Sequence, residues 1–497
     1  MNRFSRRNFL RTASLSSTAT LFPALGWNAP RKGKPPNILY IMSDDHAAHA
    51  LGSYGSVINK TPNLDRLAGQ GMRFENCFCT NSLCGPSRAT LLTGKYSHMN
   101  GFRSNTREVF DGSQPTFPKL LQSAGYQTAV VGKWHLQSEP TGFNYWCILP
   151  GQGIYNNPPM IEMGVNKKFE GYVTDIITDK AIEFLDKREK EKPFCLLYHH
   201  KAPHREWTPD PKHAAMYEDV EIPIPPTFND DYSTRGTAAR DQDMTIEKTL
   251  NKTDLKQEPP AGLNAEELKK WKYQRFIRDY LKVIASMDDN IGRVLDYLDK
   301  NGLSENTVVL YTSDNGFFLG DHGWFDKRFM YEHSLHIPLI VRYPKFIKPG
   351  SVRQELVSNL DYAETILDFA GAAIPGDMQG RSIKPLLEGK KPGDWRKSFY
   401  YHYYEFPQPH HVHPHIGVRT EQYKLIYFTD LQEYELYDLR KDHNELKNIY
   451  SDPAYAKVRQ MMLSELEVMK KKYQDNDVDK FAEGIPGPKA VQKQPKK

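Results

Sequence analysis

Short runs of almost uninterrupted apolar residues recur along the first two thirds of the chain, separated by polar or glycine-containing turns. They fall at 37–43, 127–132, 193–200, 307–313 and 337–343. Such runs are typical of strands buried on both faces of a parallel sheet. Amphipathic helical patterns lie between them, at 61–71, 117–127, 174–188 and 265–302. The alternation of strand and helix predicts an α/β fold with a large, mostly parallel central sheet.

The pattern changes at two places. Between Pro223 and Gly262 the chain is polar and rich in proline, which predicts a long surface excursion. After about Gly380, aromatic residues alternate with polar ones at 398–406, 415–420, 424–428 and 433–439, which predicts a smaller antiparallel sheet. A helix over 454–473 follows. We expect four parts: an N-terminal segment 1–34, a main domain 35–379, a C-terminal subdomain 380–475 and a disordered tail 476–497.

Composition narrows the class of protein. The chain has 497 residues, 39% of them hydrophobic, and a net charge of only +5, so it offers no electrostatic case for binding nucleic acid. Its five cysteines are too few and odd in number for a disulfide framework. Cys77, Cys79 and Cys84 lie close in sequence, but no second cysteine or histidine group with zinc-site spacing accompanies them.

The N-terminus carries a targeting pattern. Arg6-Arg7 precede an apolar stretch rich in serine, threonine and alanine, and then a proline-rich spacer. This arrangement predicts a twin-arginine export signal over residues 1–34, so we expect a periplasmic or extracellular protein that meets the twin-arginine export machinery. No later stretch is long and apolar enough to predict a membrane span.

Polar side chains follow four of the predicted strands. Asp44 and Asp45 follow the first, and Asp314 and Asn315 follow the run at 307–313. The carboxyl ends of parallel strands meet at one edge of a sheet, where ligands bind. Three carboxylates and one amide form an oxygen ligand set suited to Ca²⁺, with Mg²⁺ as the alternative.

Basic residues are expected at the same edge. They are Arg88, Lys133, His135, His204 and Lys327. A divalent cation surrounded by positive charge and proton donors suits an oxyanion such as sulfate or phosphate.

Cys84 lies where a helix over the following residues is predicted to begin, with Ser87 as a candidate cap. A thiol at a helix N-terminus near Arg88 and Lys133 is expected to have a lowered pKa. From the residues alone, Cys84 would therefore be a thiolate nucleophile.

Four sequence blocks change that interpretation. Residues 84–94, CGPSRATLLTG, resemble the signature of the formylglycine-dependent (type I) sulfatase family, and GKWH at 132–135, SDNG at 313–316 and GDHGWFDKRFMYE from Gly320 resemble its other blocks. The resemblance implies an alkaline-phosphatase-like sandwich, and it implies that Cys84 is oxidised to Cα-formylglycine (3-oxoalanine) by a formylglycine-generating enzyme. In such sulfatases the hydrated aldehyde attacks sulfur, and its second hydroxyl then allows sulfate to be eliminated.

The same resemblance assigns roles by motif. It implies that Arg88 and Lys133 hold the formylglycine and that His135 assists elimination of sulfate. It further implies that His204 and Lys327 bind sulfate and protonate the leaving oxygen. The blocks look most like carbohydrate sulfatases that act on 6-sulfated N-acetylglucosamine of the glycosaminoglycan or mucin type.

A histidine-rich segment remains. Four histidines lie among the six residues 410–415. A metal site, a plain surface turn and a substrate-binding loop are all open, although irregular spacing and Pro414 argue against metal. We expect a substrate-binding loop that presents His411, His413, His415 and Arg419 to a sugar.

Alternative functions remain open on the sequence. They are a sulfatase for another sulfated polysaccharide or an aryl sulfate, a phosphonate or phosphodiester hydrolase, and a non-catalytic protein that binds sulfated glycans. Every catalytic position expected from the family is occupied, which favours an enzyme.

Overall fold

The computed structural model describes residues 34–407 and 409–485. The predicted export signal at 1–34 therefore lies almost entirely outside the described residues. Contacts group the described residues from Pro35 onward into one compact unit. Within the described ranges, no helix is both long enough and apolar enough to cross a membrane.

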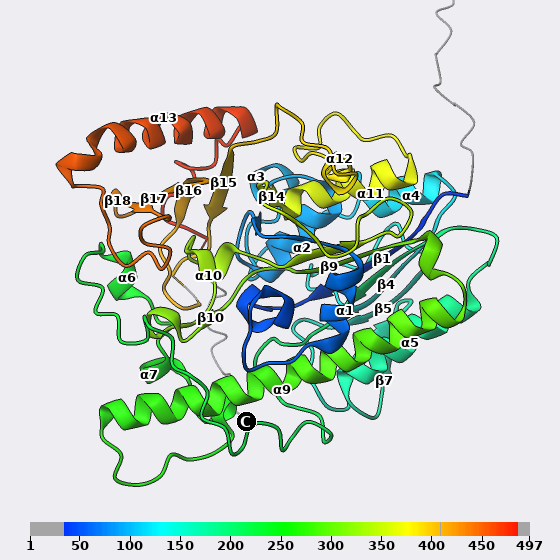
Figure 1. Cartoon of the computed structure of the whole chain (residues 1–497), viewed down its shortest axis with the longest axis horizontal. Helices are drawn as coiled ribbons and strands as arrows, with labels where there is room; N and C mark the ends of the chain where they lie inside the picture. Colours follow the sequence, from blue (N-terminus) through cyan, green and yellow to red (C-terminus); the bar gives the residue numbers. More distant parts are fainter. Residues whose placement is uncertain (1–33, 408, 486–497) are drawn as a thin grey trace, which may run out of the picture. The chain divides into compact units, whose positions relative to one another are not determined.

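A ten-stranded sheet forms the centre of this unit, in the order β13-β2-β12-β9-β1-β8-β4-β5-β6-β7 (Figure 1). Its four central strands are parallel and agree with the predicted runs. These central strands are β9 (Thr307–Ser313), β1 (Asn37–Ser43), β8 (Phe194–His199) and β4 (Gln127–Lys133). The outer strands are β13 (Ser351–Arg353), β2 (Met72–Phe74), β12 (Leu339–Arg342), β5 (Tyr145–Leu149), β6 (Pro159–Glu162) and β7 (Val165–Lys168).

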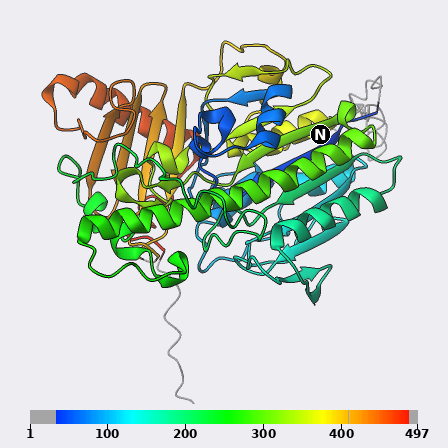
Figure 2. The same cartoon turned by 60° about the horizontal axis from the view of Figure 1, so that its bottom comes forward.

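Helices cover both faces of the sheet, so alternate residues of one strand enter different cores. Leu39 and Ile41 of β1 pack in a core with α1 (Pro62–Gln70), α5 (Val173–Lys187) and α9 (Ala265–Lys300). Ile38 and Tyr40 pack in the other core. That core includes residues of α2 (Cys84–Thr93), α4 (Phe117–Ser123) and α11 (Tyr362–Ala370). Figure 2 shows the long helix α9 beside α5 on the same face of the sheet.

The C-terminal part forms a separate antiparallel sheet, as predicted. Its strands run in sequence order: β15 (Ser398–Tyr403), β16 (His415–Thr420), β17 (Tyr423–Phe428) and β18 (Glu433–Asp438). Helix α13 (Ala456–Tyr473) packs against three of these strands through Met462, Leu466 and Met469 (Figure 1).

Three expectations need correction. Strand β12, predicted among the parallel strands, pairs antiparallel with β9 and β2. The stretch 223–262 is not a bare surface excursion, because it forms α6 (Ala238–Asp241), α7 (Ile246–Thr249) and α8 (Lys252–Leu255) and buries Phe228 and Ile246. The tail does not begin at residue 476, since Val478 and Ile485 are buried and Ile485 pairs with Glu405.

Candidate active site

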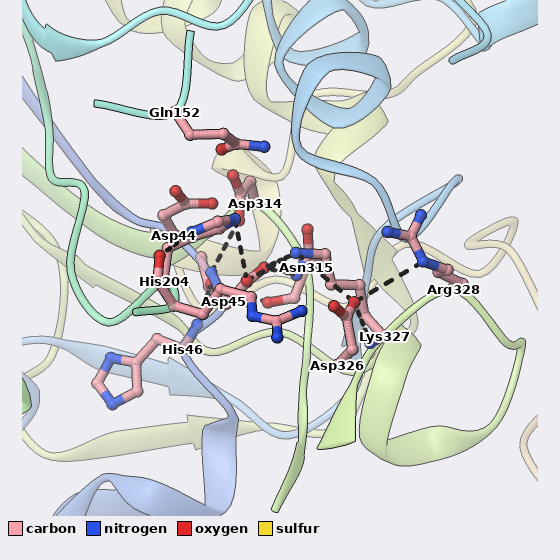
Figure 3. A network of polar contacts seen from close by, with 12 residues as sticks. Asp44, Asp45, His46, Gln152, His204, Asp314, Asn315, Asp326, Lys327 and Arg328 are labelled. Atoms are coloured by element: carbon pink, nitrogen blue, oxygen red, sulfur yellow. Dashed lines mark hydrogen bonds and ion pairs between the residues drawn. The ribbon is translucent and has the colours of Figure 1, made fainter. Parts of the chain in front are cut away.

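The ends of β1 and β9 bring the predicted metal ligands together. Ser43 and Ser313 are paired in register, so Asp44 and Asp314 leave the sheet side by side. The backbone N–H of Asp45 donates to Asp314 Oδ1 (3.1 Å), and the side-chain amide nitrogen of Asn315 donates to Asp45 Oδ1 (2.7 Å). Figure 3 shows the four side chains converging, and all of them are buried.

Two oxygens of this group fit a cation. Asp44 Oδ1 and Asn315 Oδ1 are buried without a hydrogen-bond partner, and burying an unpaired oxygen costs free energy. Ligand atoms of Asp44, Asp45, Cys84 and Asp314 all lie within 4.8 Å of one another. Burial and the nearby carboxylate of Asp44 raise the pKa of Asp314 to about 7. A hard divalent cation would satisfy the unpaired oxygens and offset the repulsion between the carboxylates.

Basic side chains close the other side of the group. Arg88 donates to Asp314 Oδ2 through Nε (3.1 Å) and Nη2 (2.8 Å), and Lys327 Nζ lies 2.6 Å from both oxygens of Asp45. Lys133 forms an ion pair with Asp44. Although burial opposes it, the Lys133 ammonium holds the pKa of Asp44 well below its usual range. The edge of the sheet thus combines candidate metal ligands with buried cations paired to them, an arrangement suited to binding an oxyanion.

Cys84 is the first residue of α2, whereas the sequence predicted a helix that begins after Ser87, beside Cys84. The thiol of Cys84 is not activated. Burial and the charge of Asp44 raise its pKa well above the ordinary value, and Lys133 only partly offsets them. The thiolate hypothesis is therefore wrong for the unmodified side chain. The cap was also wrong: Leu83 is the N-cap residue, and Ser87 instead accepts a hydrogen bond from Asn359 (2.8 Å).

A chain of contacts that the sequence did not reveal fixes the start of α2. The Gly85 amide donates to Asn105 Oδ1 (2.9 Å), and the Asn105 amide donates to Glu405 Oε1 (2.8 Å). Glu405 in turn pairs with Arg328 (3.0 Å). A Cβ on Gly85 would come within 2.6 Å of Phe102, which explains the glycine. Glu405 lies far along the chain in the aromatic C-terminal region, so no local motif indicated it.

The two predicted catalytic histidines lie beside this group. The Nδ1 atom of His204 lies 2.5 Å from the Arg205 carbonyl oxygen, which leaves Nε2 facing Asp45 at 3.8 Å. Burial and Lys133 hold the pKa of His204 well below its usual range, so its ring is neutral in the free protein. His135 is buried with Nδ1 unpaired.

Further residues that the motifs did not single out join the site. Gln152 accepts a hydrogen bond from Lys133 (2.5 Å), and Asp326, next to Lys327, pairs with His410 (3.0 Å). Figure 3 shows Gln152 and Asp326 beside the group. The only sequence signals were the position of Asp326 in the block from Gly320 and that of His410 beside the predicted His411.

The four predicted sugar contacts do not converge. His415 is fully buried; its Nε2 accepts from the Met330 amide (3.1 Å) and its Nδ1 lies 2.7 Å from the His413 carbonyl oxygen, so no ring nitrogen is free for substrate. Arg419 is held by Glu332 at 3.1–3.2 Å and lies over the Phe78 ring. His411 and His413 instead lie near Asp241. The prediction is therefore wrong for His415, and Arg419 is engaged elsewhere.

Comparisons with known proteins decide the family. The Sulfatase family matches residues 36–372, and the family N-sulphoglucosamine sulphohydrolase, C-terminal, matches residues 320–472. A protein of Bacteroides thetaiotaomicron, N-acetylglucosamine-6-O-sulfatase, is 49% identical over 492 residues, covering 90% of this chain and 88% of that protein. This chain belongs to the sulfatase family.

Two further likenesses extend the match. Human N-acetylglucosamine-6-sulfatase is 31% identical to this sulfatase over 387 residues, covering 73% of this chain and 66% of the human protein. A solved structure, in complex with its substrate D-glucosamine-2-N,6-O-disulfate, superposes with a TM-score of 0.88 at 49% identity and covers 90% of this chain and 99% of that one. The expected fold and the assignment as a sulfuric ester hydrolase are thereby confirmed.

Proposed function

We propose that this sulfatase removes the 6-O-sulfate from N-acetylglucosamine in a glycosaminoglycan or mucin-type carbohydrate. The observation that carries the proposal is the 49% identity, over 90% of the chain, to an N-acetylglucosamine-6-O-sulfatase. The solved structure at a TM-score of 0.88, bound to a sugar with a 6-O-sulfate, supports the same position on the ring.

Asp44, Asp45, Asp314 and Asn315 would hold the metal, which we propose is Ca²⁺. Their donors are all oxygen, and two of these oxygens are unpaired and buried. Such a set suits Ca²⁺ or Mg²⁺ rather than zinc. When bound, the cation would withdraw electron density from the sulfate and favour the ionised form of the nucleophile.

Residue 84 would act as formylglycine, whose hydrate supplies an oxygen nucleophile in place of the inert thiol. Arg88, fixed on Asp314 at 2.8 Å, and Lys133, paired with Asp44, would orient this residue. The hydrogen bond from the Gly85 amide to Asn105 would keep the start of α2 in place during turnover. Because these groups are held before substrate arrives, they lose little freedom in the transition state.

Lys327 and His204 would bind the sulfate and serve the leaving sugar oxygen. The sulfate's negative charge would raise the pKa of His204, so that the ring nitrogen facing the site, Nε2, can carry the proton that the sugar oxygen receives. His135, buried with Nδ1 unpaired, would accept the proton that is lost when sulfate is eliminated. Substrate charge would thus prepare the acid that is neutral in the free protein.

Export and maturation complete the proposal. The segment 1–34 would direct the protein through the twin-arginine machinery to the periplasm or beyond. A formylglycine-generating enzyme would act on Cys84 within CGPSRATLLTG before folding is complete, because Cys84 is fully buried in the folded chain.

Sulfate release from defined monosaccharides tests the substrate assignment. The panel contains N-acetylglucosamine 6-sulfate, its 3-sulfate isomer, N-acetylgalactosamine 6-sulfate and D-glucosamine-2-N,6-O-disulfate, with matched nitrophenyl sulfate and phosphate esters. We expect the highest kcat/KM on a glucosamine 6-sulfate, and no release by Cys84→Ser. A higher kcat/KM on the 3-sulfate, the galactosamine sugar or the phosphate ester would overturn it.

A further inference from the structure

Two histidines of the segment 410–415 meet an aspartate from a distant helix. Donor atoms of His411, His413 and Asp241 all lie within 4.8 Å of one another. His413 Nε2 lies 3.4 Å from Asp241 Oδ2. Asp241 ends α6, more than 160 positions earlier in the chain, so the grouping exists only in the folded protein.

The partner of the other His413 nitrogen is already fixed. His413 Nδ1 lies 2.6 Å from Asp430 Oδ2, and the Leu431 amide donates to the other Asp430 oxygen at 2.9 Å. When the Nδ1–H group of His413 donates to Asp430, the Nε2 atom of the neutral ring can only accept a hydrogen bond. His413 is only 4% exposed, and Nε2 is buried without a hydrogen-bond partner. Although burial opposes it, the carboxylates of Asp430 and Asp241 raise the pKa of His413, so the position between Nε2 and Asp241 favours a positive charge, which a proton or a metal ion can supply.

We propose that Asp241, His411 and His413 bind a second divalent metal ion, Zn²⁺, at a site separate from the catalytic group. Two imidazoles and one carboxylate are a zinc donor set, and Zn²⁺ takes tetrahedral ligands at about 2.0–2.2 Å, which places neighbouring donors about 3.3 Å apart. The 3.4 Å between His413 Nε2 and Asp241 Oδ2 matches that edge.

The surroundings suit a zinc site. Asp430 holds His413 in the way that carboxylates orient zinc-bound histidines. The Phe406 ring packs against both imidazoles, with centroids 4.9 Å from His411 and 4.7 Å from His413. Asp241 is exposed and His411 is half-buried, so an ion can enter from solvent. The catalytic group offers oxygen ligands instead, so the two sites select different metals.

A metal here would fasten the loop that precedes β16 to α6. The neighbouring His410 pairs with Asp326, next to the catalytic Lys327, and its carbonyl accepts from the Asp243 amide at 2.7 Å. The loop thus contacts the active site through His410 and carries the proposed metal ligands His411 and His413. Zinc would hold the substrate side of the loop in place and raise the melting temperature of the folded protein.

Calorimetric titration of the full chain with Zn²⁺, in excess Ca²⁺ to keep the catalytic group filled, tests the site. Wild type is expected to bind one equivalent of Zn²⁺, and Asp241→Asn and His411→Ala are expected to bind it at least about tenfold more weakly. His443→Ala, which changes an exposed histidine elsewhere, is the matched control and keeps wild-type binding. Unfolding curves without zinc show whether each variant is folded.

The alternative to a metal ion between His413 Nε2 and Asp241 Oδ2 is a proton that an imidazolium of His413 shares with Asp241. In that case wild type, Asp241→Asn and His411→Ala would bind zinc alike, and the proposal would be overturned. Co²⁺ gives an independent readout: a visible absorption band typical of tetrahedral nitrogen and oxygen ligands is expected in wild type and lost in His411→Ala. Neither readout uses sulfate release, so it is independent of the substrate assignment.

Discussion

The strand-end group and the histidine segment 410–415 are both dense in ionisable residues, yet they are built in opposite ways. The strand-end group draws Asp44, Lys133, His204 and Asp314 from four places in the sequence and gathers them at one sheet edge. The histidine segment has its residues side by side in the sequence, and the fold sends them in different directions. His410 goes to Asp326, the pair His411 and His413 to Asp241, and His415 into the core.

The difference follows from backbone geometry. Parallel strands in register deliver their last residues to one edge, so residues that follow different strands converge. In the histidine segment the backbone changes conformation instead: His410 and His411 have positive φ in a turn, and His415 begins β16, so neighbours in sequence diverge. The secondary-structure element that carries a residue therefore decides whether its neighbours in sequence share its site.

The largest expected effect is at residue 84. Cys84→Ser should lower kcat by about 10³-fold or more, because a serine ester of sulfate lacks the second hydroxyl needed for elimination. Substrate binding by the variant, measured calorimetrically, should stay near the wild-type value. Full turnover by Cys84→Ser would mean that residue 84 is not the nucleophile.

Removing one metal-facing carboxylate should have the next largest effect. Asp314→Asn takes away a charge that also anchors Arg88 at 2.8 Å, so kcat/KM should fall by about 10²–10³-fold and Ca²⁺ affinity should fall with it. Asp377→Asn, at an exposed carboxylate, is the control for the substitution itself. If both variants keep wild-type activity, the strand-end group is not the catalytic centre.

A smaller effect is expected from the support behind α2. Asn105→Ala removes the acceptor of the Gly85 amide (2.9 Å), so kcat should fall by about tenfold while KM changes little. Asn105→Asp keeps an acceptor oxygen and should recover part of the rate. A loss confined to KM would place Asn105 in substrate binding rather than in positioning residue 84.

In the histidine segment, His415 should affect stability rather than catalysis. His415→Leu leaves the Met330 amide and the His413 carbonyl without partners, which should lower the free energy of unfolding by about 1–3 kcal/mol. The fraction that remains folded should keep the wild-type KM. A raised KM with unchanged thermal stability would restore His415 as a substrate contact.

The pH dependence of stability gives a finer test of the same residue. Burial lowers the pKa of His415 to about 3, so the folded state holds it neutral while the unfolded chain takes up a proton below about pH 6.5. Its contribution to stability is therefore full above pH 6.5 and declines as pH falls toward 3, by up to about 1.4 kcal/mol per pH unit. The stability difference between wild type and His415→Leu should shrink over that range; a constant difference would contradict the assignment.

The hydrophobic pattern predicted the central strands well because these strands are buried on both faces. The predicted bounds of β1 and β9 agree with the structure residue for residue. The edge strand β7, which consists of exposed residues, carried no such pattern and was not predicted. The antiparallel direction of β12 was also out of reach, because an apolar run does not encode which way its strand points.

The same distinction separates the site residues that the sequence predicted from those that it did not. Side chains that follow central strands were predicted from the sequence, because topology alone brings them together. Asn105, Gln152 and Glu405 were not, since each reaches the site from a loop or from the second sheet, and their partners are set by tertiary packing. The prediction of a lowered pKa for the Cys84 thiol was wrong for a related reason. The sequence indicated a helix N-terminus, but it did not indicate the burial of the thiol or the facing carboxylate of Asp44.

Peptide mass tests directly whether residue 84 is formylglycine. The measurement is the mass of the peptide that contains this residue, taken from protein produced with its maturation enzyme and confirmed active in sulfate release. Replacing the thiol by an aldehyde removes one sulfur and two hydrogens and adds one oxygen, so we expect a peptide lighter by about 18 Da, whereas ordinary thiol oxidation would make it heavier. Because the hydrated aldehyde regains the mass of one water, a peptide of unchanged mass is also treated with a hydrazide. A peptide in fully active protein that is unchanged in mass and unreactive toward the hydrazide, or one that is heavier, would show that residue 84 is not formylglycine.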